Sequence, residues 1–157
     1  TEFELKECAH QLLDALRTLH MAGFIHSQLE PSNIVLEVNK RANQVTIALR
    51  RLLKCQRQDQ SSVPFPIQRA CAAALQANPF APPEVRRGEI PSVKSDIWGA
   101  GASLYALAYR RLPFVNDQQI NDRSLEFPEK PKTSPAFKQL VASMLKLSEQ
   151  DRPSAQQ

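Results

Sequence analysis

Several side chains that could take part in chemistry lie close together between positions 26 and 36, in the run His-Ser-Gln-Leu-Glu-Pro-Ser-Asn-Ile-Val-Leu. Glu30 and Asn33 supply a carboxylate and an amide oxygen that could share a cation. Gln28 cannot accept a proton at neutral pH, and the charge of Glu30 would repel a phosphate group. The run therefore supplies candidate cation ligands, while the side chain of Gln28 is no proton acceptor and that of Glu30 is no anion-binding group.

The sequence around this run predicts the elements that would hold it. Apolar residues at helical spacing predict a helix over residues 1–22. Short apolar runs at 34–36 and 45–49 lie on either side of polar residues and predict a small β-hairpin. Residues 94–109 are apolar nearly all round, which predicts a buried central helix, and residues 135–157 predict C-terminal helices. The expected fold class is mainly α with one small hairpin.

Residues 26–33 resemble the catalytic loop of eukaryotic protein kinases, His-Arg-Asp-Leu-Lys-Pro-x-Asn. In that family the aspartate orients the substrate hydroxyl, the lysine steadies the phosphate and the asparagine binds metal. By this resemblance the aspartate position is Gln28, the lysine position is Glu30, and Asn33 is retained. His26 is then expected to anchor the loop in the core, because its acidic neighbour is absent.

Residues 45–52 resemble the strand and the Asp-Phe-Gly motif that follow this loop in kinases, Val-Lys-Ile-x-Asp-Phe-Gly-Leu. The aspartate, the main magnesium ligand of the family, is Leu49 here. Arg50 stands where the phenylalanine would be, and Arg51 where glycine would supply flexibility. The resemblance implies that magnesium loses a charged ligand and that an arginine points into a site built for cations.

The second half of the chain is similar to the same family in three further motifs. Glu84 closes a Pro-Pro-Glu that resembles the family's Ala-Pro-Glu, Asp96 lies in Ser-Asp-Ile-Trp-Gly-Ala-Gly, and Arg152 lies in Asp-Arg-Pro-Ser-Ala. The resemblance implies a partly buried ion pair between Glu84 and Arg152. It also implies that Asp96 accepts hydrogen bonds from the backbone at His26 and Ser27.

Together these motifs make residues 1–157 similar to the C-terminal lobe of a protein kinase, with the N-terminal lobe absent from this chain. The degenerate catalytic loop would span 26–33, the degenerate Asp-Phe-Gly 49–51, and the activation segment 49–84. A glycine-rich loop and a strand lysine, which hold nucleotide phosphates in kinases, are missing. The expectation is therefore that the chain uses no cofactor or metal and does not bind nucleotide.

The leading functional prediction is a catalytically inactive pseudokinase domain that acts as a protein–protein interaction or scaffolding module within a larger protein or assembly. The positions that keep the fold are filled by suitable residues, while the chemical positions Gln28, Glu30 and Leu49 are not. Trp98 is expected in the core. The candidate interface with a protein partner comprises Phe114, Gln118, Gln119 and Ile120.

Two alternatives remain open. One is an atypical Ser/Thr-type kinase fragment with residual nucleotide binding, in which Glu30 replaces a missing base or metal ligand. The other is a structural subunit that contacts nucleic acid through residues 40–87, which contain nine basic and two acidic residues. Few aromatic residues accompany these charges, so base stacking is poorly provided for. The basic residues are Lys40, Arg41, Arg50, Arg51, Lys54, Arg57, Arg69, Arg86 and Arg87.

The composition fits one globular domain, with 157 residues, 42% hydrophobic and 23% charged, and a net charge of +4. No apolar run is long enough for a membrane helix, and the N-terminus lacks the features of a signal peptide. An intracellular location, cytoplasmic or in a cytoplasmic or organellar assembly, is expected. The odd number of cysteines, without Cys-x-x-Cys spacing, predicts reduced thiols rather than disulfides or a zinc site. These are Cys8, Cys55 and Cys71.

Overall fold

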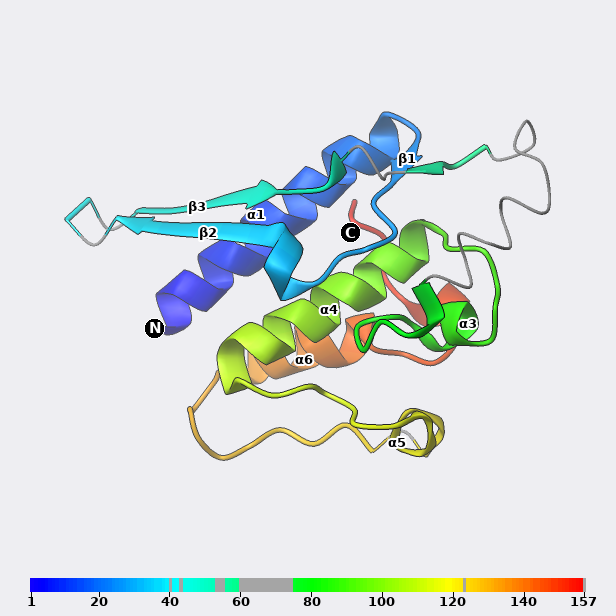
Figure 1. Ribbon diagram of the computed structural model, residues 1–157. Helices are drawn as coiled ribbons and strands as arrows, with labels where there is room; N and C mark the ends of the chain where they lie inside the picture. The colour runs from blue at the N-terminus through cyan, green and yellow to red at the C-terminus, as the bar shows by residue number, and fades with distance from the viewer. Residues whose placement is uncertain (40, 43, 53–55, 60–74, 123, 157) are drawn as a thin grey trace.

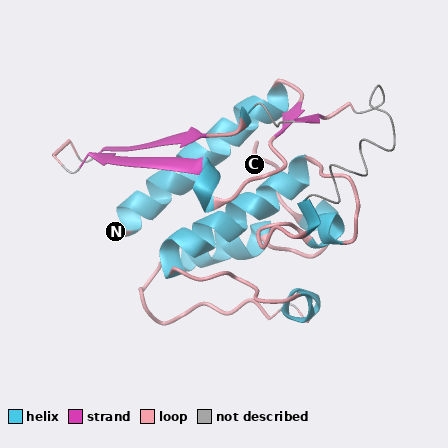
Figure 2. Ribbon diagram, in the orientation of Figure 1, coloured by secondary structure: helices cyan, strands magenta, loops and turns pink. Residues whose placement is uncertain are grey.

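The computed structural model describes every residue except 40, 43, 53–55, 60–74, 123 and 157. It is helix-rich, and the described residues form two small antiparallel sheets of two strands each (Figure 2). Figure 1 shows the long helices α1, α4 and α6 in successive layers, with the hairpin β2–β3 lying along α1. No described helix is long and apolar enough to cross a membrane.

Helix α1 (Glu2–Met21) carries the hairpin on one side and faces the central helix on the other. The hairpin strands β2 (Ile34–Asn39) and β3 (Gln44–Leu49) pair in register from Ile34 with Leu49 to Asn39 with Gln44. Both polar atoms of the Gln11 side chain, on α1, bind the backbone of β3. Its Nε2 donates to Val45 O (2.6 Å), and its Oε1 accepts from Ile47 N (2.9 Å). The Gln11 amide therefore takes the place of a neighbouring strand at this edge.

The central helix α4 (Val93–Tyr109) begins at Val93 and is capped by Ser92, whose side chain accepts a hydrogen bond from Lys94 N. It is buried on most faces, as expected for a helix that is apolar nearly all round. Helix α6 (Pro135–Met144) packs closely against it, because a Cβ at Gly101 would lie 2.8 Å from Met144 Cβ. Glycine at this position therefore permits the close approach of α4 and α6.

The short elements complete the fold. Strand β1 (Phe24–Ile25) pairs with β4 (Gln56–Arg57), and the 3-10 helix η1 (Pro31–Asn33) precedes β2. The other helices in the described part of the chain are α3 (Pro83–Arg86), α5 (Asp117–Asn121) and the 3-10 helix η3 (Glu149–Asp151).

The C-terminal region differs from the expected helices over 135–157. Helix α6 ends at Met144, and only the short η3 follows it among the described residues. The buried Arg152 donates to the carbonyl oxygens of Lys146 (2.8 Å) and Leu147 (3.2 Å), just beyond the end of α6. These carbonyls are bound by a side chain instead of by amides of a continuing helix, which stabilises the turn of the chain.

The fold makes a prediction about Cys8, which lies inside α1 and is 2% exposed. Burial, together with the nearby carboxylates of Glu4 and Glu7, raises the pKa of the Cys8 thiol. Because the thiolate is the reacting form, iodoacetamide is expected to label native Cys8 much more slowly than the unfolded chain at about pH 8. Peptide mass mapping over time measures this. Equal rates in both states would contradict it; Cys55 and Cys71 lie outside the described residues.

Candidate functional site

The loop that follows β1 is held by Asp96, in the first turn of α4. Asp96 Oδ2 accepts a hydrogen bond from His26 N (2.7 Å), and Oδ1 accepts one from Ser27 N (2.8 Å). Both predicted hydrogen bonds are therefore present. Asp96 is 1% exposed, and His20 Nε2 on α1 lies 2.9 Å from its Oδ2. One buried carboxylate thus joins α1, α4 and the loop, and sequence analysis did not foresee the part played by His20.

Two further features fix this loop on α4. Ser27 has a φ of 67°, a left-handed conformation that is unfavourable for a residue with a side chain, and its amide is bound by Asp96. A Cβ at Gly99 would lie 2.9 Å from Leu29 O and 3.0 Å from Leu29 Cβ. The loop backbone can therefore rest directly on α4 only because position 99 is a glycine.

Asn33 joins the end of the loop to residues 49–51. Its buried side chain donates from Nδ2 to Gln28 O (2.8 Å), and its backbone oxygen accepts from Arg50 N (2.8 Å). On the other side, His26 Nε2 lies 2.8 Å from Arg50 O, and His26 is fully buried. The backbone of Arg50 is therefore held between the start and the end of the loop.

Gln28 and Glu30, the two substituted positions of the loop, differ in the hydrogen bonds of their side-chain oxygens. The side-chain oxygen Oε1 of Gln28 is buried and has no hydrogen-bond partner among the described residues. Glu30 is half-buried, and both of its carboxylate oxygens accept hydrogen bonds, from Ser32 Oγ (2.5 Å) and from Asn78 Nδ2 (3.0 Å). The carboxylate of Glu30 is thus fixed at the surface of the loop. Asn78, which sequence analysis missed, lies far along the chain in a stretch with no distinctive pattern.

Glu84 and Arg152 form the ion pair that the sequence predicted. Arg152 Nη1 donates to Glu84 Oε1 (2.7 Å) and Nη2 donates to Oε2 (2.8 Å), a bidentate contact between side chains that are 0% and 4% exposed. Ser95 Oγ donates to the same Oε1 (3.0 Å), and the Arg152 guanidinium lies 4.9 Å from the centre of the Trp98 ring. The pair fixes α3 and the C-terminal turn to the start of α4.

This set of contacts agrees with the comparison to known families. A family model described as "Protein kinase domain" matches residues 1–157. The chain belongs to the protein kinase domain family. The solved structure of the Rad53 kinase domain and SCD2 in complex with AMPPNP has a TM-score of 0.73 to this chain, at 23% identity, and the match covers 99% of this chain and 56% of that one. The fold is therefore kinase-like.

Curated relatives of this kinase-family chain carry the names of serine/threonine kinases. STK11 of Gallus gallus is 28% identical over 155 residues, 94% of this chain and 33% of the relative. PDK1 of Cryptococcus neoformans is 30% identical over 152 residues, 93% of this chain and 12% of the relative. Ppk6 of Schizosaccharomyces pombe is 31% identical over 129 residues, 82% of this chain and 15% of the relative. The chain thus spans a third or less of the length of these relatives.

These findings overturn the prediction of a catalytically inactive pseudokinase scaffold that is not an enzyme. The relatives are named serine/threonine-protein kinases, and the family match covers the whole chain. The solved kinase domain is described in complex with AMPPNP, but at 23% identity it shows a shared fold alone, so the expectation that nucleotide is not bound stays a prediction. Sequence reasoning rested on the substituted positions Gln28, Glu30 and Leu49 and on the missing N-terminal lobe. Identity at single motif positions does not show how charged groups such as the Glu30 carboxylate, which Ser32 and Asn78 hold in the same loop, are arranged.

Magnesium, which kinases use to neutralise nucleotide phosphates, does not fit the residues of this site. Magnesium prefers oxygen ligands and is usually bound through one or two carboxylates. Leu49 offers a hydrocarbon side chain, and the side chains of Arg50 and Arg51 are exposed cations. No group of three or more His, Cys, Asp or Glu residues in the described ranges could hold a metal ion. Of the two positions that bind the metal in the kinase resemblance, 33 and 49, Asn33 retains a side-chain oxygen and Leu49 does not.

The candidate interface is changed by the structure. Phe114 is buried and stacks on Trp98 with ring centres 5.7 Å apart, and Ile120 is also buried. Phe114 is 6% and Ile120 3% exposed, so little of either side chain is available to a partner, because both pack in the core beside α4. Gln118 is exposed, and the half-buried Gln119 accepts a hydrogen bond at Oε1 from Val115 N (2.8 Å). The interface prediction therefore narrows to Gln118 and Gln119.

Two arginines of the basic stretch at residues 40–87 form ion pairs. Arg86 contacts Asp117 (2.8 Å), and Arg87 contacts Glu89 (3.1 Å). Arg41, Arg50, Arg51 and Arg57 are exposed, whereas Lys40, Lys54 and Arg69 lie outside the described residues.

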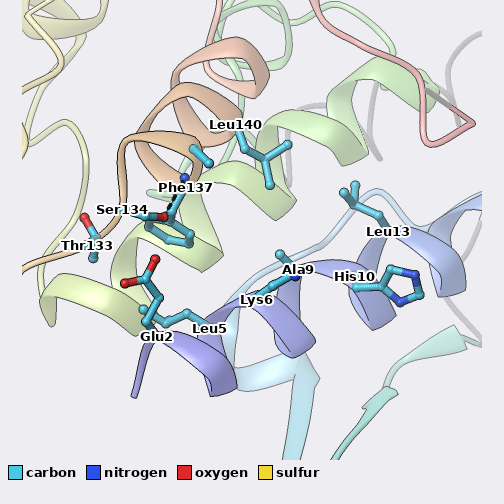
Figure 3. A pocket seen from close by; sticks show the side chains of 11 residues that line it. Glu2, Leu5, Lys6, Ala9, His10, Leu13, Thr133, Ser134, Phe137 and Leu140 are labelled. Atoms are coloured by element: carbon cyan, nitrogen blue, oxygen red, sulfur yellow. Dashed lines mark hydrogen bonds between the residues drawn. The ribbon is translucent and has the colours of Figure 1, made fainter.

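An apolar cavity of about 280 Å³ lies between α1 and α6, away from the catalytic loop. Figure 3 shows Phe137 and Leu140 of α6 opposite Leu5, Ala9 and Leu13 of α1. None of the residues singled out in the sequence lines it.

Proposed function

We propose that this chain forms the C-terminal lobe of an atypical serine/threonine-protein-kinase-type domain, which binds a nucleoside triphosphate and transfers its terminal phosphoryl group to a protein hydroxyl. The observation that carries the proposal is the buried Asp96, which holds the backbone of the catalytic loop at His26 and Ser27. Phosphoryl transfer depends mainly on positioning and electrostatics, so a fixed loop is its first requirement. The names of the curated relatives support the same function.

The hairpin supplies the surface for the nucleotide in this proposal. By the kinase resemblance, the adenine ring rests on the first strand, where half-buried Val35 is paired with exposed Ala48. The second strand, β3, ends at Leu49 and leads directly into Arg50, whose amide donates to Asn33 O, so the phosphates would lie beside Asn33. Base and phosphates would then be bound by consecutive segments of the hairpin and loop.

Glu30 is the residue that we assign to orient the acceptor hydroxyl. It is the only carboxylate between His26 and Asn33. Ser32 and Asn78 fix both of its oxygens, and an ionised carboxylate has about four lone-pair sites, so acceptor capacity remains for a hydroxyl. Gln28 cannot replace it, because its side-chain oxygen is buried.

Glu30→Gln is expected to lower phosphoryl transfer about 100-fold, since a positioned base contributes about 10² to 10⁴ in rate. The measurement follows labelled phosphate from ATP into a mixed protein substrate, with the natural full-length protein that contains this chain. Glu37→Gln, the same change at an exposed position of β2, is the control and should retain the parent rate.

The outcomes separate the parts of the proposal. Equal rates for Glu30→Gln and the parent would refute the role of Glu30 alone. A parent protein that binds ATP without transferring phosphate would refute the transferase activity and leave nucleotide binding. A parent protein that does neither would refute the proposed function as a whole.

A further inference from the structure

We propose that Arg50 and Arg51 form a binding site for the phosphates of a nucleoside triphosphate that works without a divalent cation. The inference rests on the proposed function, since it specifies how nucleotide would be held at the same site. It starts from a disagreement within the molecule: the fold is that of a protein kinase, yet Leu49, Arg50 and Arg51 do not suit magnesium. The two guanidinium groups would supply the positive charge instead.

The backbone of Arg50 is fixed where the phosphates would lie. Arg50 N donates to Asn33 O (2.8 Å), and Arg50 O lies 2.8 Å from His26 Nε2. His26 is fully buried and Asn33 is 3% exposed, so both contacts are anchored in the core. An arginine on a fixed backbone loses less conformational freedom when it binds a ligand than one on a free loop.

Both arginine side chains remain available. They are exposed, and the ion pairs of arginines in the part of the chain that the structure describes involve other positions. Those are Arg17, Arg86, Arg87 and Arg152. A guanidinium presents five N–H donors in a planar fork, stays charged at any ordinary pH and matches phosphate geometry. Two adjacent ones can therefore satisfy several phosphate oxygens.

The charge of the site favours the metal-free nucleotide. A triphosphate without magnesium carries more negative charge than its magnesium complex, and it brings no cation close to Arg50 and Arg51. Charges about 4 Å apart interact by about 1 to 4 kcal/mol depending on the local dielectric. The nearest carboxylate of the loop, Glu30, is held by Ser32 and Asn78. A bound magnesium ion would meet repulsion from the guanidinium groups and no carboxylate at Leu49.

The test is calorimetric titration of the natural full-length protein with ATP and with inorganic tripolyphosphate, in EDTA and then in magnesium. ATP is expected to bind in EDTA at least as tightly as in magnesium, and tripolyphosphate is expected to bind in EDTA. Arg50→Gln is expected to weaken ATP binding in EDTA about tenfold, because it removes a charge-assisted hydrogen bond. Arg41→Gln, an exposed arginine at the hairpin tip, is the matched control.

Three results would overturn the inference. ATP affinity that rises more than about tenfold on addition of magnesium would show that a metal carries the phosphates, while the proposed function would stand. Unchanged affinity in the double variant Arg50→Gln, Arg51→Gln would show that other groups bind them. If neither ATP nor tripolyphosphate binds in either buffer, the inference fails together with nucleotide binding. Thermal unfolding of each variant verifies that these exposed substitutions leave the fold intact.

Discussion

Replacing Glu84 with alanine is expected to lower the free energy of unfolding by about 3 to 5 kcal/mol, because it leaves a buried guanidinium without its counter-charge. Arg152 is fully buried, and Glu84 accepts two of its hydrogen bonds. The other hydrogen bonds of the Arg152 side chain are to the neutral carbonyls of Lys94, Lys146 and Leu147. These dipoles bind the N–H groups but do not neutralise the charge. Chemical denaturation of the variant and the parent measures the difference.

Glu89→Ala is the control for this experiment. Glu89 also pairs with an arginine, Arg87, but their side chains are 56% and 61% exposed. Exposed pairs contribute between about 0 and 1 kcal/mol, so this variant should unfold close to the parent. The double variant Glu84→Ala, Arg152→Met should recover part of the loss, since it removes the stranded charge. A Glu84→Ala variant as stable as the parent would refute the argument.

The contacts that sequence could predict are those that a short motif specifies completely. The partners of Asp96 and Arg152, about 70 residues away, were implied by the resemblance of their motifs to those of kinases. The resemblance carries over to this chain because a buried carboxylate or guanidinium needs a partner of opposite charge or several donors.

Other contacts could not be predicted, because their physical cause is the packing of the folded chain. Gln11 binds the edge of β3, and Asn78 binds Glu30, although neither position differs in type from many polar surface residues. Phe114 and Ile120 were assigned to an interface, yet both are buried beside α4. An apolar residue in a loop, such as Phe114, or in a helix as short as α5, such as Ile120, gives no sequence signal of whether it faces a core or a partner.

The error about activity has a similar origin. Sequence comparison records which residue occupies each motif position, and it counted Gln28 and Leu49 as losses. Phosphoryl transfer depends on where charges lie, and a neighbouring position can present one. The structure places the Glu30 carboxylate in the same loop and the Arg50 backbone against Asn33. Activity must therefore be argued from the arrangement of all charged groups in the site.

Asp96→Ala is expected to have the other large effect, lowering the free energy of unfolding by about 3 kcal/mol or more. Hydrogen bonds to a charged group contribute about 1.5 to 3 kcal/mol each, and their contributions are not additive. The substitution leaves the amides of His26 and Ser27 without acceptors in a buried site, and it removes the partner of His20. Thermal or chemical denaturation measures the loss, with Asp117→Ala, a largely exposed aspartate, as the control.

The Asp96→Ala variant also tests whether Asp96 fixes the conformation of the loop at residues 26–29 in addition to stabilising the whole fold. Ser27 keeps a left-handed backbone while Asp96 binds its amide, so loss of the carboxylate should let this residue relax. We expect hydrogen exchange to increase first at residues 26–29, at temperatures where α4 and α6 remain protected. Uniform loss of protection across the molecule would instead show that Asp96 contributes to global stability alone. A local increase would mean that this carboxylate sets the conformation of the loop on which nucleotide binding and phosphoryl transfer are proposed to depend.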